Sequence, residues 1–257
     1  LIATGKPLST AGMMIEDRTR TYTIAMERTV VPENFSFRMT DEEYRVLEKI
    51  KNSIPVCYLA DHADFALGIV TGNNKKFLSA EKTENSEMVL KGTDICKYHI
   101  NPAKQYLRFE PEQFQQVAPL EIYRAPEKLL YRFISNQLVV AYDDRQMLSL
   151  NSCNIVIPKI EGMQIKYILA ILNSSVSQFV YQKEFHSIKV LRAHMEHIPI
   201  PRVGKAIQNE IIAMTEPLIC GMGKEAAETC QKRLDCRIMD LFRLSAEEQW
   251  VIRHALH

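Results

Sequence analysis

The chain has 257 residues, of which 46% are hydrophobic and 25% are charged. This composition is ordinary for a globular protein with a sizeable core, and no apolar run approaches the ~20 residues that span a bilayer. The formal net charge of +1 argues against a domain that grips a polyanion by bulk charge alone. We expect a cytoplasmic protein that does not enter a membrane. Because the chain begins at Leu1 rather than Met, we also expect it to be part of a longer protein.

The cysteines give no indication of a metal site. They form no Cys-x-x-Cys pair, and no histidine lies at a spacing typical of zinc ligands. We interpret them as reduced thiols of a cytoplasmic protein and predict no metal ligand in this chain. The cysteines are Cys57, Cys96, Cys153, Cys220, Cys230 and Cys236.

The first predicted element is a helix that follows an irregular N-terminal segment, residues 1–40. Thr40-Asp41-Glu42-Glu43 is typical of a capped helix start, and Ile54-Pro55 ends the helix. From about residue 56 to residue 158, short apolar runs alternate with Gly, Asn, Asp and Pro clusters. This pattern predicts short strands joined by turns.

The clearest helix is predicted for residues 165–181. Apolar residues recur there at three- and four-residue intervals, so one face of the helix should pack against the core. On that face, Ile168, Leu169, Leu172 and Phe179 are expected to be buried.

An extended stretch, Ile198-Pro199-Ile200-Pro201, comes next, because each proline disfavours helical geometry in the residue before it. Residues 204–257 then have the period of helices, with a turn at Gly221-Met222-Gly223. The predicted fold class is therefore α+β. We expect a β-rich, mixed-sheet body with packed helices and a C-terminal helical tail.

No catalytic constellation is present in the sequence. The only Asn-Pro step, Asn101-Pro102, continues as Ala103-Lys104 and so lacks the Asn-Pro-Pro-Tyr type of loop that adenine-N6 methyltransferases carry. A cofactor-binding glycine turn, the Glu-x-Lys or Asp-x-Lys step of common nucleases, and a Gly-x-x-x-x-Gly-Lys loop are also absent. We therefore expect no catalysis and no bound cofactor in this chain.

The stretch most indicative of nucleic-acid binding runs from Gly68 to Leu78, with the letters GIVTGNNKKFL. We interpret it as a strand that enters a tight turn and leaves through two lysines, because Gly and Asn tolerate positive φ. Asparagine amides can pair with adenine, and lysines reach phosphates or guanine edges. The alternative interpretation is a polar hairpin whose lysines are merely solvated.

Other cations alternate with tyrosines between residues 91 and 145, as expected where a basic surface meets bases or sugars. Each such cation taken alone is typical of a solvated surface, and only their joint occurrence favours binding. The arginines and tyrosines involved include Arg124, Arg145, Tyr123, Tyr131 and Tyr142. The candidate DNA-binding residues are Thr71, Asn73, Asn74, Lys75, Lys76, Lys91, Lys97, Tyr98, Lys128 and Arg132.

Four stretches, in this order, resemble the TaqI-like C-terminal specificity domain of adenine-N6 DNA methyltransferases and fused type II restriction–modification enzymes. The resemblance extends over about residues 45–203, and residues 1–40 match no family that we can name. The four stretches are residues 68–77, residues 90–98, residues 126–132 followed by 141–143 and 150–152, and residues 166–174 with 198–201.

The resemblance implies a target-recognition domain of a restriction–modification system at residues 41–203, followed by a helical tail at residues 204–257. Such a domain holds double-stranded DNA against an adenine-N6 methyltransferase domain, with or without an endonuclease, that lies in cis or on a partner subunit. It reads bases mainly from the major groove, while the catalytic domain flips the target adenine and supplies S-adenosylmethionine.

Two other classes of function stay open on the sequence. One is an enzyme with dispersed catalytic residues, and the other is a protein–protein adaptor that docks through the helical tail. Salt discriminates between DNA binding and an adaptor contact, because binding of DNA by several cations weakens steeply as salt is added.

Overall fold

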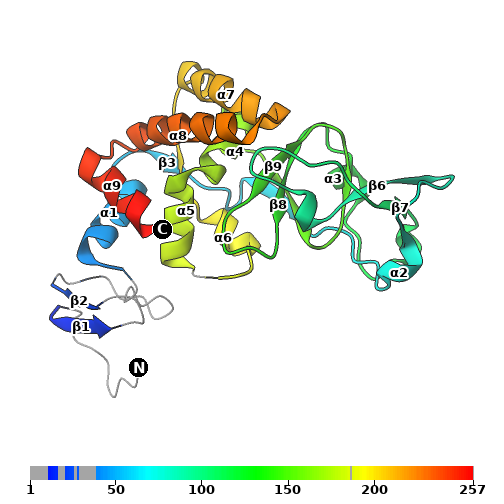
Figure 1. Ribbon diagram of the computed structural model, residues 1–257, viewed down its shortest axis with the longest axis horizontal. Coiled ribbons are helices and arrows are strands. Elements are labelled where there is room, and N and C mark those ends of the chain that lie inside the picture. Colours follow the sequence, from blue (N-terminus) through cyan, green and yellow to red (C-terminus); the bar gives the residue numbers. More distant parts are fainter. Residues whose placement is uncertain (1–10, 17–20, 26–27, 29–38, 186, 257) are drawn as a thin grey trace.

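The computed structural model describes residues 11–16, 21–25, 28, 39–185 and 187–256, and the structural statements below concern these residues. In this part of the chain, no helix is long and apolar enough to cross a membrane. The elements (Figure 1) are β1 (Met13–Glu16), β2 (Thr21–Ile24), α1 (Asp41–Asn52), β3 (Val56–Cys57), β4 (Ala63–Ala66), α2 (Asn74–Phe77), β5 (Leu78–Ser79), β6 (Ser86–Leu90), η2 (Gly92–Asp94), β7 (Tyr106–Arg108), η3 (Pro111–Gln113), α3 (Leu120–Tyr123), β8 (Lys128–Arg132), β9 (Val140–Asp143), β10 (Leu148–Ser149), β11 (Cys153–Pro158), α4 (Ile165–Asn173), α5 (Ser175–Glu184), α6 (Arg192–Glu196), β12 (Ile200–Pro201), α7 (Lys205–Cys220), α8 (Lys224–Leu241) and α9 (Ala246–Ala255).

The N-terminal segment contains a short hairpin rather than irregular chain alone. β1 pairs antiparallel with β2, with Met13 opposite Ile24, and the Ile15 and Ile24 side chains are buried. The β-branched and aromatic residues of both strands favour this pairing. The expectation of an irregular segment is therefore wrong for β1 and β2, and most of the remainder of residues 1–40 lies outside the described part.

Helix α1 begins where the sequence predicts. Thr40 Oγ accepts a hydrogen bond from the Glu43 backbone amide (3.2 Å), and the Glu43 carboxylate accepts one from the Thr40 amide (2.9 Å). This reciprocal pair satisfies two amides that the helix itself leaves without acceptors. The buried face of α1, with Val46 and Ile50, faces α9, whose own start is capped in the same way by Ser245.

Two four-stranded sheets form the β-rich body, as the predicted α+β class requires. One sheet has the order β4-β11-β8-β9 and is antiparallel throughout. The other has the order β10-β6-β7-β5 and is mixed, because β10 runs parallel to β6. The fold is therefore a mixed-sheet body with helices packed on it, which confirms the predicted class.

The helix predicted for residues 165–181 is two helices, α4 and α5, that meet at Ser174. The Ser174 backbone is extended (φ −70°, ψ 159°), and its hydroxyl oxygen accepts a hydrogen bond from the Ser177 amide (3.2 Å) and so caps α5. Serine competes for backbone hydrogen bonds in this way, which breaks the helix without disturbing its apolar period. The predicted burial is confirmed, since the side chains of Ile168, Leu169, Leu172 and Phe179 are 0% exposed.

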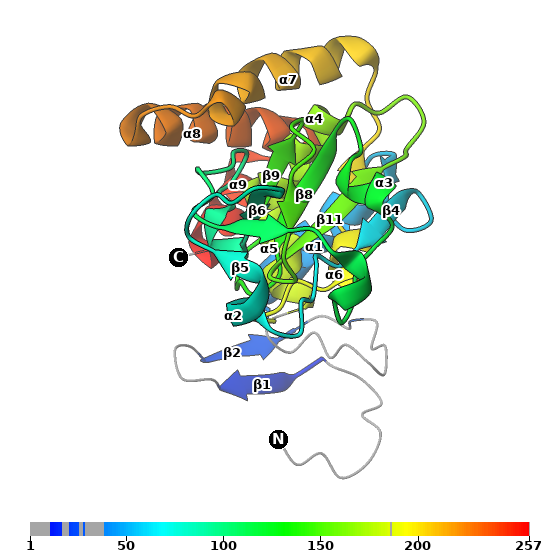
Figure 2. The same cartoon turned by 90° about the vertical axis from the view of Figure 1, so that its right-hand side faces the viewer.

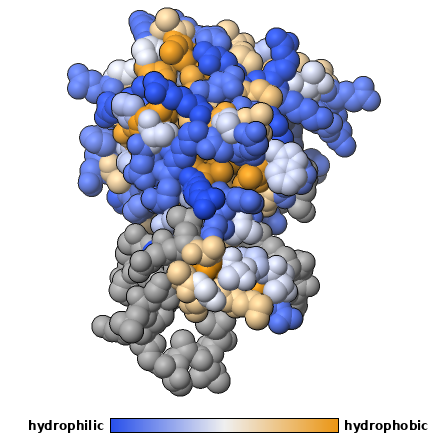
Figure 3. All heavy atoms as spheres, turned by 90° about the vertical axis from the view of Figure 1, so that its left-hand side faces the viewer, coloured by the Kyte–Doolittle hydropathy of each residue, from blue (hydrophilic) through white to orange (hydrophobic). Residues whose placement is uncertain are grey.

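Most of the long helices lie at the end of the molecule opposite the β10-β6-β7-β5 sheet. In Figure 1, α1, α5 and α9 lie at the left and α7 and α8 run along the top, whereas α2, β6 and β7 lie at the right. Gly221, with φ of 78°, turns the chain between α7 and α8, as the sequence predicts. Figure 3 shows the helical end, where hydrophobic groups are interspersed among hydrophilic ones.

Candidate nucleic-acid interface

Residues 71–77 form a capped single turn of helix rather than the predicted hairpin turn. The Asn73 side-chain oxygen accepts a hydrogen bond from the Lys76 amide (3.3 Å) and so caps α2. The Thr71 hydroxyl donates to the Asn74 side-chain oxygen (2.7 Å), and Thr71 itself is buried. Thr71 therefore supports the turn and does not face solvent, which corrects its assignment to the interface.

The other polar residues of this turn are exposed. Asn73, Asn74, Lys75 and Lys76 all face solvent on α2, at the end of the body opposite the helical layer (Figures 1 and 2). The Lys76 ammonium lies 4.7 Å from the centre of the Phe77 ring, which holds its methylene stem against the surface. Within the described residues, neither lysine forms a salt bridge with a carboxylate.

A second segment, residues 110–117, lies directly beside this turn, and no sequence pattern predicts its proximity. Val70 and Gln116 exchange backbone hydrogen bonds of 2.9 and 3.1 Å. The Lys76 ammonium donates to the Gln113 side-chain oxygen (3.1 Å), and a Cβ at Gly72 would lie 3.4 Å from that of Gln115. The exposed end of the body is therefore built from two segments, whose contacts join residues 37 to 46 positions apart in the sequence.

Lys128 cannot contact DNA, because its side chain is 0% exposed. Its ammonium lies 2.6 Å from the Asp143 carboxylate, which is also 0% exposed, and it donates a further hydrogen bond to the Tyr123 carbonyl (2.6 Å). Burial lowers the pKa of Lys128, and the nearby Asp143 acts in the opposite direction. The pair sits on neighbouring strands, since Lys128 is opposite Asp143 in the register of β8 and β9. Lys128 is therefore a structural residue, and its predicted role is wrong.

Arg132 is also engaged inside the protein. Its guanidinium donates to the backbone carbonyls of Gly92 (2.9 Å) and Ile95, so it ties η2 to β8. Lys91 stays half-buried at the end of β6. Leu150 pairs in parallel with Ile69 on one side, and the parallel pairing of β10 with β6 places Lys91 on its other side. Lys91 and Ile69 are therefore about two strand spacings, or roughly 10 Å, apart.

Lys97 and Tyr98 face the helices and not the exposed end. The Lys97 ammonium donates to the Asn173 carbonyl at the end of α4 (3.2 Å), and burial lowers the pKa of Lys97. Tyr98 is 2% exposed and extends the edge of β9, since its amide donates to the Val140 carbonyl (2.7 Å). Burial raises the pKa of the Tyr98 phenol well above its ordinary value. Tyr98 is therefore closed to solvent, and the Lys97 ammonium is directed at the end of α4.

The alternation of cations and tyrosines is mostly an internal feature. Tyr123 is 0% exposed and Tyr131 is 3% exposed, and burial raises the pKa of Tyr131 to about 12. Arg124 forms an ion pair with Glu87 (2.6 Å). The predicted basic and aromatic surface between residues 123 and 145 is therefore largely the interior of the two sheets.

Residues 68–77 and residues 90–98, two of the stretches singled out in the sequence, meet at one loop, residues 150–153. A Cβ at Gly68 would lie 2.2 Å from the Leu150 carbonyl oxygen, and one at Gly92 would lie 2.5 Å from the Ser152 carbonyl oxygen. No side chain fits at either position, so both glycines permit close approach of backbone. The Gly92 amide also donates to the Ser152 hydroxyl oxygen (3.0 Å). These motifs join the two sheets and place α2.

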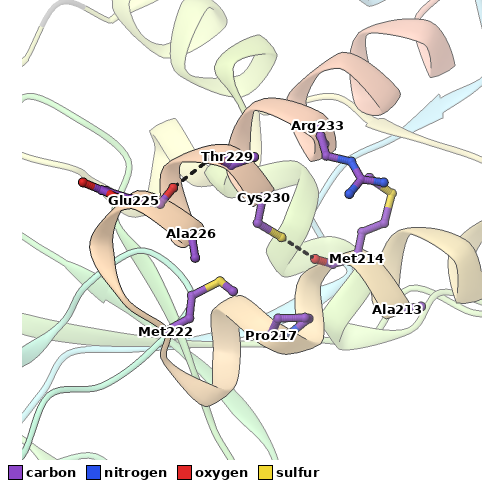
Figure 4. A pocket seen from close by; sticks show the side chains of 9 residues that line it. All are labelled: Ala213, Met214, Pro217, Met222, Glu225, Ala226, Thr229, Cys230 and Arg233. Carbon is purple, nitrogen blue, oxygen red and sulfur yellow. Dashed lines mark hydrogen bonds between the residues drawn. The ribbon is translucent and has the colours of Figure 1, made fainter.

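Two hollows in the described residues lie away from α2. One, of about 610 Å³, lies between α7 and α8 and is lined mainly by apolar groups, among them Met214, Pro217 and Met222 (Figure 4). Another, of about 620 Å³, lies beside Tyr142 and Lys166. Across the described ranges, no three His, Cys, Asp or Glu side chains are grouped as metal ligands. Neither hollow adjoins α2.

Comparisons with known proteins give one family match and several structural ones. Residues 87–200 match the model of the TaqI-like C-terminal specificity domain, a narrower range than the 45–203 expected. No curated protein matches the chain.

Among solved structures, a chain of the type IIL restriction–modification enzyme MmeI, solved in complex with DNA, is similar with a TM-score of 0.51 at 12% identity, over 78% of this chain and 35% of that one. The HsdS subunit from Thermoanaerobacter tengcongensis is similar with a TM-score of 0.41 at 14% identity, over 84% of this chain and 50% of that one. This chain thus spans half or less of the length of these two. Residues 87–200 are thus similar to the TaqI-like C-terminal specificity domain, and the fold is shared with part of a restriction–modification enzyme.

Proposed function

We propose that this chain recognises a specific sequence in double-stranded DNA, and that the exposed end around α2 is the contact surface. The observation that carries the proposal is the exposure of Asn73, Asn74, Lys75 and Lys76 together on a backbone held by side-chain caps. Adjacent lysines without carboxylate partners repel each other modestly in water and are favoured beside phosphates. Asparagine amides next to them can contact base edges.

The rest of the fold supports this assignment. The specificity-domain match covers β7 to β11 and most of β6, and part of the MmeI enzyme, which was solved in complex with DNA, has a similar fold. The glycine contacts at loop 150–153 fix the turn to the two sheets. A rigid scaffold that presents a short polar turn is the usual arrangement for a binding loop.

The test first requires the target sequence. The full chain is incubated with a random duplex library at low salt, and bound duplexes are recovered over several rounds; enrichment of one sequence motif is expected. Asn73→Ala should then lower the preference for that motif by about 5- to 150-fold if Asn73 contacts a base. Lys75→Ala should weaken cognate and random duplexes alike and reduce the salt slope by ~1. Enrichment of no motif by the wild-type chain would refute the proposed function.

We further propose that the chain acts in the cytoplasm, as part of a site-specific adenine-N6 DNA methyltransferase or type II restriction enzyme. A methyltransferase domain, in cis or on a partner subunit, would bind S-adenosylmethionine and flip the adenine, and this chain would hold the duplex in register. The purified chain alone should therefore transfer no methyl group to duplex DNA and cut none. Methyl transfer above background by residues 1–257 would contradict this division of roles.

A further inference from the structure

We propose that Gln115 and Gln116 read adenine in the target sequence beside α2. This inference rests on the proposed function and extends it to a second segment and to a kind of base pair. It predicts at least one A·T pair in the target at the position that these two side chains face.

First, the segment of residues 113–116 is held against the exposed turn that carries α2. Gln116 is joined to Val70 by two backbone hydrogen bonds, and Gln115 lies against Gly72, where φ is 75°. The Gln113 side chain is bound to Lys76. Contacts from three residues, Gln113, Gln115 and Gln116, therefore hold this segment along the exposed turn.

The second step is rigidity, which a base-reading side chain requires of its backbone. Phe114 is buried between the glutamines, and its ring packs edge-on against Phe77 at 5.2 Å and against Phe109 at 5.9 Å. Pro111 begins the short turn η3 that leads into the segment. The buried ring thus anchors a backbone from which the neighbouring amides project into solvent.

The third step is the division of roles among the amides. Gln113 is occupied, since it accepts a hydrogen bond from Lys76 and donates one to the Glu110 carboxylate (2.8 Å). Gln115 and Gln116 are exposed, and within the described residues their side-chain amides form no hydrogen bond. A glutamine amide without other partners can donate from its NH₂ group to N7 of adenine and can accept through its carbonyl oxygen from the 6-amino group, both in the major groove.

The charge around the segment favours base contacts over backbone contacts there. Glu112 is exposed beside Gln113, and Glu110 forms an ion pair with Arg108 (2.8 Å). Carboxylates repel phosphates, whereas Lys75 and Lys76 attract them. The duplex backbone should therefore cross the lysine side of the surface, with the glutamines directed into the groove.

The experiment compares the double variant Gln115→Ala/Gln116→Ala with the wild-type chain and with Gln137→Ala, an exposed glutamine of the β8–β9 loop, beside α5. Each protein selects duplexes from the same random library, and its affinity for the wild-type motif and for single A·T to G·C changes is measured. We expect the double variant to lose about 5- to 150-fold of its preference at one or two A·T positions and to retain its affinity for random duplexes. The control should select the wild-type motif.

Two different failures are distinguishable. If the wild-type chain selects a motif and the double variant selects the same motif with the same preference at every position, the glutamine assignment is wrong and the proposed function stands. If the wild-type chain selects no motif, the proposed function itself fails. Circular dichroism and a thermal unfolding curve establish that the double variant is folded, as expected for two exposed side chains.

Discussion

Replacing Lys128 by methionine separates a structural role from a DNA-binding role most sharply. The substitution leaves the Asp143 carboxylate 0% exposed, with only the Arg145 and Met147 backbone amides as donors, at 2.8 and 3.0 Å. It also removes the donor to the Tyr123 carbonyl. Removing one partner of a buried pair costs about 3–5 kcal/mol, a large part of the ~5–15 kcal/mol that stabilises a typical domain.

The assay is urea unfolding followed by circular dichroism, where this loss should lower the midpoint by roughly 1–2 M for an m-value near 3 kcal/mol/M. The double variant Lys128→Met/Asp143→Asn removes both charges, keeps an acceptor oxygen for the loop amides, and should be more stable than Lys128→Met alone. Lys75→Met is the matched control, with a change in unfolding free energy within ~0.5 kcal/mol. If Lys128→Met is as stable as the wild type but binds DNA as weakly as Lys75→Met, the structural assignment of Lys128 is refuted.

Three further outcomes test the fold. Gly68→Ala should lower the unfolding free energy by at least ~1–3 kcal/mol, because its Cβ would meet the Leu150 carbonyl oxygen at 2.2 Å. Gly204→Ala, which has open space around it, should change the unfolding free energy little. Equal stability of the two variants would contradict the close approach at Gly68. Leu172→Ala should lower the free energy of urea unfolding by ~2–5 kcal/mol, whereas Leu120→Ala, at an exposed position, should lower it little. A small loss for Leu172→Ala would contradict the burial of α4. The pKa of Tyr131 is raised from an ordinary 10 to about 12, so its contribution to the unfolding free energy should be fully present below pH 10 and should fall by about 3 kcal/mol as the pH rises through 12. The Tyr131→Phe variant should lose less unfolding free energy over that range. An alkaline stability profile that is the same in the variant and the wild type would contradict the assignment.

The sequence predicted the elements that depend on local chemistry. Thr40 and Glu43 identified the start of α1, and the apolar period identified the buried face of α4 and α5, because capping and periodicity are properties of neighbouring residues. The break at Ser174 was missed, since a serine that caps a new helix and a serine inside a helix have the same local pattern.

The candidate site was predicted only in part, because exposure is a property of the tertiary fold. Lys128 and Tyr98 lie in stretches rich in cations and tyrosines, yet β8, β9 and the helices enclose both of them. No sequence pattern singles out Gln115 and Gln116, because their contacts with Gly72 and Val70 join residues that are 43 and 46 positions apart. Non-local pairings of this kind cannot be inferred from one sequence.

The most direct test of DNA recognition at the α2 end is to locate the bound duplex on the chain. A photoreactive phenylalanine derivative is placed at position 75 on α2, or at the exposed position 232 on α8, and each protein is irradiated with the selected duplex. We expect cross-linking to DNA from position 75 that is lost when excess unlabelled cognate duplex is added, and none from position 232. Cross-linking from position 232 with none from position 75 would contradict the assignment of the interface.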